Sequence, residues 1–216
     1  PDGNAVVFVK DGTFHEVDIR TKQVHEISFT ARVEQELGPL IYHEMPFRDD
    51  SLVIRNVRYG GMSPDGSQLV FGSLNQLWIM DLPDGEPRPL IEGHRGQYQP
   101  VFSPDGSSVA FVSWHETEGG HLWRVSAQGR ELQRLTSYPA YYANPAWSRD
   151  GSKIAYVNED PAATRNRNSN NRGIIEWIPS LGGEAQSVVS APSDNVLTFT
   201  KDGTRITFAE RGTLVS

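Results

Sequence analysis

A turn-like tetrapeptide recurs along this chain and constrains its fold more than any other feature. Ser-Pro-Asp-Gly or a close variant stands at 63–66, 103–106, 148–151 and 200–203, and the chain opens on Pro-Asp-Gly. Five positions after each glycine stands an aromatic residue: Phe8, Phe71, Phe111, Tyr156 and Phe208. A unit that returns at intervals of about 40–50 residues predicts a repeat architecture.

The tetrapeptide is predicted to be a tight turn and not a reactive site. Proline presets the φ angle of the second turn position, aspartate tolerates the third, and glycine accepts the positive φ of the fourth. Short apolar stretches flank each turn, which predicts a β-hairpin. A ring of aspartates that binds cations is the alternative, but a site needs groups that converge, and these turns recur once in every unit.

Each unit is predicted to hold four short antiparallel strands, which we call A, B, C and D in chain order. Strands A and B flank the turn. Strand C carries a tryptophan, as in QLWIMD (76–81), and strand D follows it, as in PRPLIE (87–92). This size and strand count are typical of a β-propeller blade. A β-sandwich and a β-solenoid remain alternatives, although neither requires an aromatic residue at the same position in every unit.

The predicted fold class is therefore all-β, a propeller arc with three complete and two partial blades. The expected boundaries are a partial blade 1–30, an insertion 31–55, blades 56–92, 93–136 and 137–190, and a partial blade 191–216. Because the strands of the two partial blades do not complement each other, we expect a segment of a larger protein or a chain that covers its sheet edges by self-association.

The repeat pattern resembles the TolB-like, PD-type propeller repeat, and the stretch 120–157 is especially similar to it. Such blades occur in periplasmic TolB, in tricorn-like and prolyl-oligopeptidase-like peptidases, and before amidohydrolase domains of large bacterial proteins. The stretch 31–66 looks most like the last group. The resemblance implies a non-catalytic scaffold or interaction segment of a bacterial hydrolase, or alternatively a cell-envelope interaction module, and a periplasmic or secreted location. A propeller that gates a serine peptidase is a third reading.

Composition and the absence of known motifs exclude several classes of function for this chain. The formal net charge of −7 argues against nucleic acid as a partner, and no apolar run is long enough for a membrane span. The sequence has no cysteine, no G-x-S-x-G elbow, no phosphate loop and no H-E-x-x-H motif. We therefore predict no cofactor, no metal site and no catalytic residues in this chain. His115 and His121 with Glu116 and Glu118 could form a metal or acid–base cluster, but a solvated loop is the favoured reading.

One face of the predicted arc collects recognition-type residues. The turns lie at the ends of the blades where A joins B, so the B–C and D–A connections lie at the opposite ends. The candidate binding residues there are His94, Arg95, Tyr98, Trp114, His115, His121, Tyr138, Tyr141 and Tyr142. Arg165, Arg167 and Arg172 join them from the long connection 158–173. Tyrosine and arginine are typical of protein interfaces, so the expected partner is a protein or another domain of the parent chain. The alternative is that the tyrosines cover the rim and that Pro100 and Pro145 begin strand A.

Overall fold

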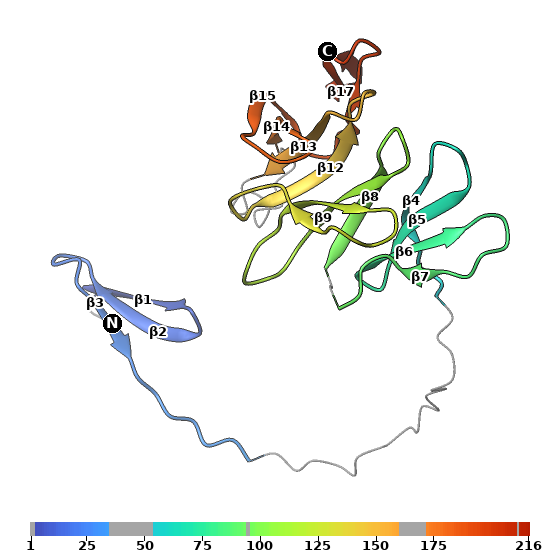
Figure 1. Cartoon of the computed structure of the whole chain (residues 1–216). Helices are drawn as coiled ribbons and strands as arrows, with labels where there is room; N and C mark the ends of the chain where they lie inside the picture. Colours follow the sequence, from blue (N-terminus) through green and yellow to red (C-terminus); the bar gives the residue numbers. More distant parts are fainter. Residues whose placement is uncertain (1–2, 35–53, 94–95, 160–171, 211) are drawn as a thin grey trace. The chain divides into compact units, whose positions relative to one another are not determined.

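The computed structural model describes residues 3–34, 54–93, 96–159, 172–210 and 212–216 (Figure 1). The chain forms two compact units, Pro1–Ser51 and Leu52–Ser216, which are described separately. The division of the chain into blades and an insertion at the boundaries given above stays a prediction.

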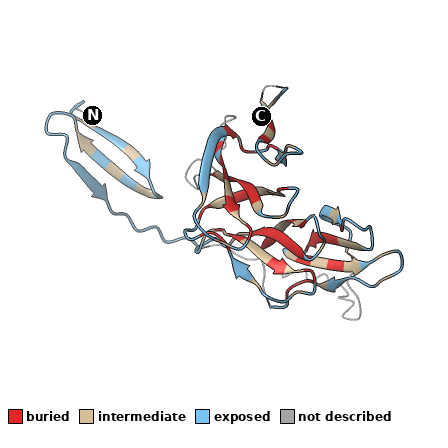
Figure 2. Ribbon diagram, turned by 45° about the horizontal axis from the view of Figure 1, so that its top comes forward, coloured by how far each residue is buried: buried red, intermediate tan, exposed pale blue. Residues whose placement is uncertain are grey.

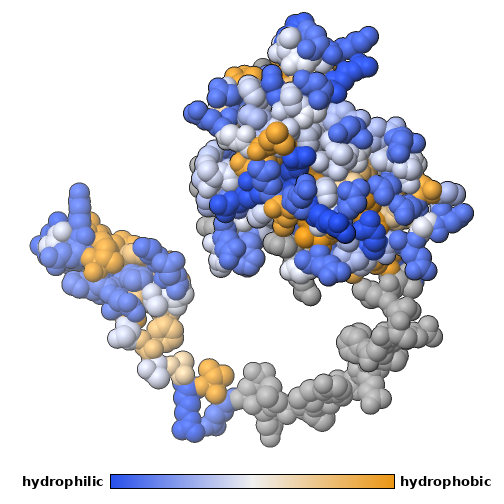
Figure 3. All heavy atoms as spheres, in the orientation of Figure 1, coloured by the Kyte–Doolittle hydropathy of each residue, from blue (hydrophilic) through white to orange (hydrophobic). Residues whose placement is uncertain are grey.

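The first unit is one antiparallel sheet in the order β1-β2-β3, with β1 (Ala5–Lys10), β2 (Thr13–Asp18) and β3 (Val24–Ile27). Apolar side chains of this sheet remain exposed, including Val6, Val9 and Phe14. Figure 3 shows apolar (orange) atoms on the surface of this unit. The sheet buries few of its own apolar side chains.

The second unit consists of four successive sheets. The first contains β4 (Arg58–Met62), β5 (Gln68–Ser73), β6 (Gln76–Asp81) and β7 (Arg88–Pro89). The second contains β8 (Gln97–Phe102), β9 (Ser108–Ser113), β10 (Leu122–Ser126) and β11 (Gln133–Arg134). The third contains β12 (Tyr141–Trp147), β13 (Lys153–Glu159), β14 (Arg172–Pro179) and β15 (Gln186–Pro192). The last contains β16 (Thr198–Phe199), β17 (Ile206–Glu210) and β18 (Thr213–Val215).

The all-β prediction is confirmed. Throughout the described residues every sheet is antiparallel and no helix occurs; consecutive strands in the chain are neighbours in each sheet. Three four-stranded and two three-stranded sheets match three complete and two partial blades. Since the described part contains no helix, it also contains none that could cross a membrane.

The repeated tetrapeptide closes the hairpin between strands A and B in four sheets. In the second sheet of unit 2, the Gly106 N–H donates to the Ser103 carbonyl over 2.9 Å, and Gly106 has a φ of +74°. The Asp105 carboxylate accepts hydrogen bonds from the hydroxyls of Ser103 and Ser107 and from the Ser107 N–H. The serine and aspartate of the motif are therefore occupied in holding the turn.

The hydrogen bonds of these turns make stability depend on pH. They hold the pKa of Asp65, Asp150 and Asp202 at about 2, below the ordinary value of 3.8, because neighbouring Ser or Thr hydroxyls and backbone N–H groups donate to each carboxylate. A lowered pKa in the folded state adds stability above the unfolded pKa, and that stability is lost as the pH falls through the folded pKa.

We therefore expect the free energy of unfolding to decrease as the pH falls from about 4 to about 2. Asp150→Asn should destabilise the chain at neutral pH, and its difference from the wild type should shrink as the pH falls toward about 2, where Asp150 begins to be protonated in the folded state as well. Urea titrations of both proteins across this range measure the difference. A constant difference would contradict the assigned role of the carboxylate.

Three hydrophobic cores lie between successive sheets of unit 2. Alternate residues of the B strands β9 and β13 enter different cores, because side chains of a strand point to opposite faces. Val109 and Phe111 of β9 pack toward the β4–β7 sheet. Ala110 and Val112 pack toward the β12–β15 sheet. Figure 2 shows buried residues (red) along the strands of unit 2. The B strands β5, β9 and β13 are largely buried, and the repeated aromatic residues Phe71, Phe111, Tyr156 and Phe208 are all at most 5 % exposed.

Each A strand of the three four-stranded sheets in unit 2 contains a bulge at the same position. The register shifts between Arg58 and Gly61 in β4, and at the equivalent places in β8 and β12. The residue at the start of each bulge has a positive φ although it is not glycine: Tyr59, Gln99 and Asn144, at +55°, +52° and +53°. Pro100 and Pro145 follow directly inside β8 and β12, so these prolines do not begin strand A as the alternative reading required.

Candidate functional site

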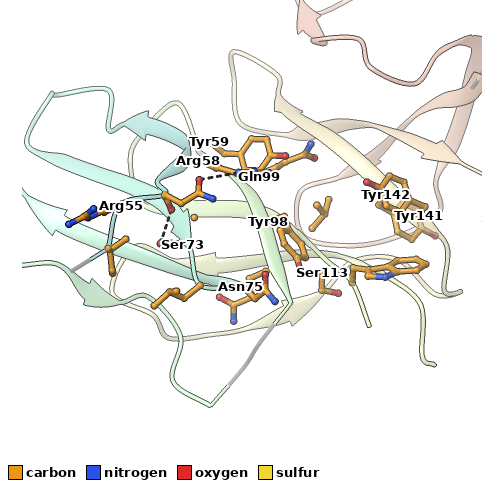
Figure 4. Close-up of a pocket in the computed structure, with 17 residues that line it drawn as sticks. Arg55, Arg58, Tyr59, Ser73, Asn75, Tyr98, Gln99, Ser113, Tyr141 and Tyr142 are labelled. Atoms are coloured by element: carbon orange, nitrogen blue, oxygen red, sulfur yellow. Dashed lines mark hydrogen bonds between the residues drawn. The ribbon is translucent and has the colours of Figure 1, made fainter. Parts of the chain in front are cut away.

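A cavity of about 660 Å³ lies where strand A of one sheet begins beside the end of strand B of another (Figure 4). Its walls come from residues 54–56, the starts of β4, β8 and β12, the ends of β5 and β9, the turn 74–75 and Trp114. These are B–C and D–A ends of the blades, opposite the Ser-Pro-Asp-Gly turns. We call this hollow the tyrosine cavity.

Aromatic side chains form much of its lining. Figure 4 shows Tyr98 in the middle of the labelled group, with Tyr141 to one side and Tyr59 to the other. The Trp114 and Tyr141 rings meet edge to face with centroids 5.4 Å apart. Burial, and after it the negative charge of Glu159, raises the pKa of the Tyr141 hydroxyl. This hydroxyl therefore stays protonated at neutral pH and can donate a hydrogen bond to a ligand.

Backbone hydrogen bonds fix the position of Trp114 and of the residues that follow it. The backbone N–H of Trp114 donates to the Gly96 carbonyl over 2.8 Å. His115 and Gly119 exchange two backbone hydrogen bonds, and Gly120 pairs in the same way with Ala140. The connection between β9 and β10 is thus tied to the segment that leads into β12, which brings Trp114 beside Tyr141.

The bulge residues link neighbouring blades at the border of the cavity. The Gln99 amide oxygen accepts the Asn144 N–H over 2.7 Å, and the Gln99 amide nitrogen donates to the Asn144 side chain over 3.1 Å. Asn144 in turn donates to the Ser193 carbonyl over 3.1 Å. Backbone in the left-handed region costs free energy for residues other than glycine, so these bonds stabilise a conformation that would otherwise be unfavourable.

Replacing Gln99 with leucine should therefore lower the free energy of unfolding by about 1–3 kcal/mol, because the Asn144 N–H loses its partner in a part-buried place. Gln133→Leu is a matched control, since its single hydrogen bond, to the Leu181 carbonyl, is exposed. Urea denaturation measures both. Equal losses in the two variants would contradict the role of Gln99.

Two positively charged side chains also line the cavity. Arg55 and Arg58 line it, and the Arg58 Nε donates to the Asn56 side chain over 3.2 Å. No Asp or Glu is present among the described residues that form its walls. Amide and hydroxyl groups, including those of Asn75, Gln99 and Ser113, complete the polar lining.

The structure brings three of the predicted binding residues, Tyr98, Trp114 and Tyr141, together around this cavity. Tyr142 also borders it but belongs to the core: it is only 3 % exposed, and its hydroxyl donates to the Tyr138 carbonyl over 2.9 Å. The ring packs against Tyr156 at a centroid distance of 5.5 Å. Tyr142 is therefore a packing residue. The sequence-based prediction that it belongs to an exposed binding face is wrong, because its side chain is buried.

The other predicted residues lie away from the cavity lining. Tyr138 is exposed, and its hydroxyl accepts a hydrogen bond from the Asn158 side chain. Arg172 is paired with Glu210 over 3.1 Å and with the Ser190 carbonyl, so it ties the last two sheets together. His94, Arg95, Arg165 and Arg167 lie outside the described residues.

The two histidines of the connection between β9 and β10 do not form a common site. His115 is exposed and contacts Thr117, whereas the His121 ring contacts the Thr136 hydroxyl over 3.1 Å. Partial burial, and after it the nearby Arg134, lowers the pKa of His121. In the part of the chain that the structure describes, no three His, Asp or Glu side chains gather in a way that could hold a metal ion.

Arg58, Tyr59 and Gln99 are cavity residues that the sequence reasoning missed. A signal exists, because Tyr59, Gln99 and Asn144 each stand six positions before the aspartate of the following turn. Polar or aromatic residues at this position, followed by glycine or proline, mark the bulges. Their side chains depart from the alternation expected of a regular strand, which is why period-two reasoning does not find them.

Comparison with known proteins identifies the repeat. Residues 59–210 match the family model described as the PD40 TolB beta propeller domain. The chain belongs to this family. The match runs from β4 to the end of β17, in which the PD40 turns close the hairpins and the tyrosine cavity lies at the opposite ends of the blades.

Relatives of this PD40 chain include peptidases and TolB proteins. An uncharacterized peptidase of Bacillus subtilis, YuxL, is 31 % identical over 116 residues, which are 49 % of this chain and 18 % of the relative. The Tol-Pal system protein TolB of Anaeromyxobacter dehalogenans (strain 2CP-1) is 39 % identical over 90 residues, 39 % of this chain and 20 % of the relative. This chain thus spans about a fifth of the length of either protein.

Solved structures agree on the fold. TolB from Acinetobacter baumannii superposes with a TM-score of 0.58 at 19 % identity, over 98 % of this chain and 47 % of that protein. At such identity the likeness concerns the fold alone.

Proposed function

We propose that this chain is a non-catalytic recognition segment, a set of PD40 blades that binds a protein segment at the tyrosine cavity. The observation that carries the proposal is the cavity itself, which gathers Tyr98, Trp114, Tyr141 and Arg58 on one face of unit 2. Tyrosine, tryptophan and arginine dominate the energetics of protein interfaces. The serines and aspartates of the opposite turns are engaged in their own hydrogen bonds, which favours a scaffold role for that face.

The parent protein is proposed to be a bacterial hydrolase in which these blades bind or admit a polypeptide for a catalytic domain elsewhere. Two relatives support a peptidase: YuxL, and the tricorn protease homolog 1 of Streptomyces coelicolor, which is 36 % identical over 86 residues, 40 % of this chain and 8 % of that protein. An amidohydrolase parent rests only on the resemblance of the stretch 31–66.

A second candidate is a cell-envelope interaction module of the TolB type, in the periplasm. The identity of 39 % to a Tol-Pal system protein favours it. The coding sequence that flanks these residues separates the candidates. A serine-hydrolase domain with a nucleophile elbow supports the peptidase, a barrel with metal-binding histidines supports the amidohydrolase, and an N-terminal β/α domain supports the TolB type.

Site-specific photo-crosslinking in the source cell tests the proposal. A benzophenone amino acid at position 98, on the cavity, should yield a discrete adduct with one polypeptide. The same group at position 181 is the control, because Leu181 is exposed in the connection between β14 and β15, on the face of the turns. An adduct from position 181 alone, or none from position 98, would contradict recognition at the tyrosine cavity.

A further inference from the structure

The inner strands of unit 2 form a second hollow, an open groove of about 780 Å³, which we call the inner groove. It is lined by residues of β4, β8, β12 and β16, the A strands of four successive sheets. The inner groove adjoins the tyrosine cavity, because Tyr59 and Gln99 line the cavity while the next residues, Gly60 and Pro100, line the groove.

The two hollows carry cations in a chain that is acidic as a whole. Arg55 and Arg58 line the cavity, and Arg149 and Lys201 line the groove. Among the residues described, neither hollow is lined by a carboxylate. The chain as a whole contains 27 acidic and 20 basic residues. This concave side therefore has a charge opposite in sign to that of the chain.

Aspartates lie near the cations of the groove: Asp150 and Asp202 adjoin them in sequence, and Asp105 lines a hollow together with Arg149. Each of these carboxylates accepts hydrogen bonds within its own turn. The Asp150 carboxylate accepts hydrogen bonds from the hydroxyls of Ser148 and Ser152. The Asp202 carboxylate accepts them from Thr200 and Thr204. Both carboxylates are held within their own turns, which leaves the side chains of Arg149 and Lys201 exposed along the groove.

Apart from Arg149 and Lys201, the residues that line the groove are mainly apolar. Met62 is 65 % exposed and Val196 is 81 % exposed, and Pro100 and Pro145 lie in the strands between them. Exposed apolar side chains in a concave surface favour aliphatic or aromatic groups of a ligand. A polypeptide offers such groups next to its carboxylates, whereas an acidic carbohydrate has no aliphatic side chains to place there.

Pro100 and Pro145 also restrict how a polypeptide can bind. Proline has no N–H, so it removes a donor from the free edges of β8 and β12 and disfavours the addition of another strand there. Recognition along the groove therefore depends on side chains, with the cations as partners for carboxylates.

We propose that the tyrosine cavity and the inner groove together bind an extended polypeptide segment that combines acidic with apolar residues. This inference rests on the proposed function, since it names the chemistry of the partner for the same face. A carboxylate near Arg58, a second one near Arg149 or Lys201, and apolar side chains between them complement the lining.

Selection from a phage-displayed library of random peptides tests the inference, with residues 1–216 immobilised. The expected result is enrichment of sequences with Asp or Glu flanking aliphatic or aromatic residues. Changing the acidic residues of a selected peptide to Asn or Gln should weaken binding about tenfold or more, because hydrogen bonds between charged groups are the strong ones. Fluorescence anisotropy measures these affinities, which should also decrease as salt is added.

Matched variants locate the effect. Arg58→Gln should weaken binding of the acidic peptide about tenfold and leave its amide version unchanged. Arg88→Gln should change neither, because Arg88 is an exposed cation on the outer strand β7. Both residues are exposed, so neither change is expected to unfold the chain.

The other outcomes separate this inference from the proposed function. Enriched peptides that are neutral or basic, or acidic peptides that bind Arg58→Gln as well as the wild type, would overturn the inference and leave the recognition function standing. Failure to enrich any peptide over a Tyr98→Ala chain would overturn both. Binding of oligogalacturonate in place of peptides would show that the cations serve an acidic carbohydrate, which also overturns the inference.

Discussion

Replacing Tyr142 with alanine will lower the free energy of unfolding by about 3–5 kcal/mol, the range for truncating a large aromatic side chain in a core. Tyr142 is 3 % exposed and packs in the core between the β8–β11 and β12–β15 sheets. Burial also raises the pKa of its hydroxyl, which donates to the Tyr138 carbonyl. Tyr142→Phe keeps the ring and should cost only about 1 kcal/mol, the typical net value of one hydrogen bond.

Tyr98→Ala is the matched control in the cavity. Tyr98 is half-buried and lies at the border of the same core. Its replacement should cost clearly less than that of Tyr142, about 1–2 kcal/mol, because only part of the ring leaves an apolar environment. Urea denaturation of the three variants gives the comparison. If Tyr142→Ala lowers the free energy of unfolding only slightly, as Tyr98→Ala does, then Tyr142 is not a core residue and the sequence-based prediction of an exposed side chain is correct.

Gly96→Ala is expected to have the second large effect, a loss of about 3 kcal/mol or more. Gly96 has a φ of +72°, and an added Cβ would lie 2.2 Å from the Trp114 carbonyl oxygen. The backbone of Trp114 would have to move, which breaks the hydrogen bond from its N–H to Gly96. The cost therefore combines left-handed strain, about 1–2 kcal/mol, with the loss of this contact.

Gly93→Ala is the control that separates the backbone strain of a positive φ from the steric clash of the added Cβ. Gly93 has nearly the same φ, +74°, but an added Cβ would meet nothing within 4 Å. It should cost only the strain, about 1–2 kcal/mol. Thermal or urea unfolding measures both variants, and the tryptophan fluorescence of Gly96→Ala should also change because Trp114 moves. Similar losses in the two variants would contradict the close approach of Gly96 and Trp114.

The fold could be predicted from the sequence because its turn repeats. Proline, aspartate and glycine each have a conformational reason to stand where they do in 103–106, and the structure confirms the hairpin. The aromatic five residues after each glycine predicts packing between blades, and Phe111 and Tyr156 are indeed buried between sheets. Local turn chemistry and strand alternation therefore suffice for the architecture.

The cavity could be predicted only in part. Blade connectivity places the starts of β8 and β12 on the same face, which is sufficient to group Tyr98 with Tyr141. It does not distinguish Tyr141 from Tyr142, since neighbouring residues of a strand point to opposite sides and only the register decides which side is the core. Tyr59 and Gln99 depend on bulges, which alter the register within strand A.

The central claim is that recognition takes place at the tyrosine cavity and the adjoining inner groove, and that the serines and aspartates of the repeated turns hold the turns together. A crystal structure of residues 1–216 with the tightest peptide from the library tests it most directly. The account predicts peptide along β4 and β8, with a carboxylate at Arg58 and a side chain against Tyr98. Peptide bound away from both Arg58 and Tyr98, or added as a strand to an outer edge of a sheet, would contradict it.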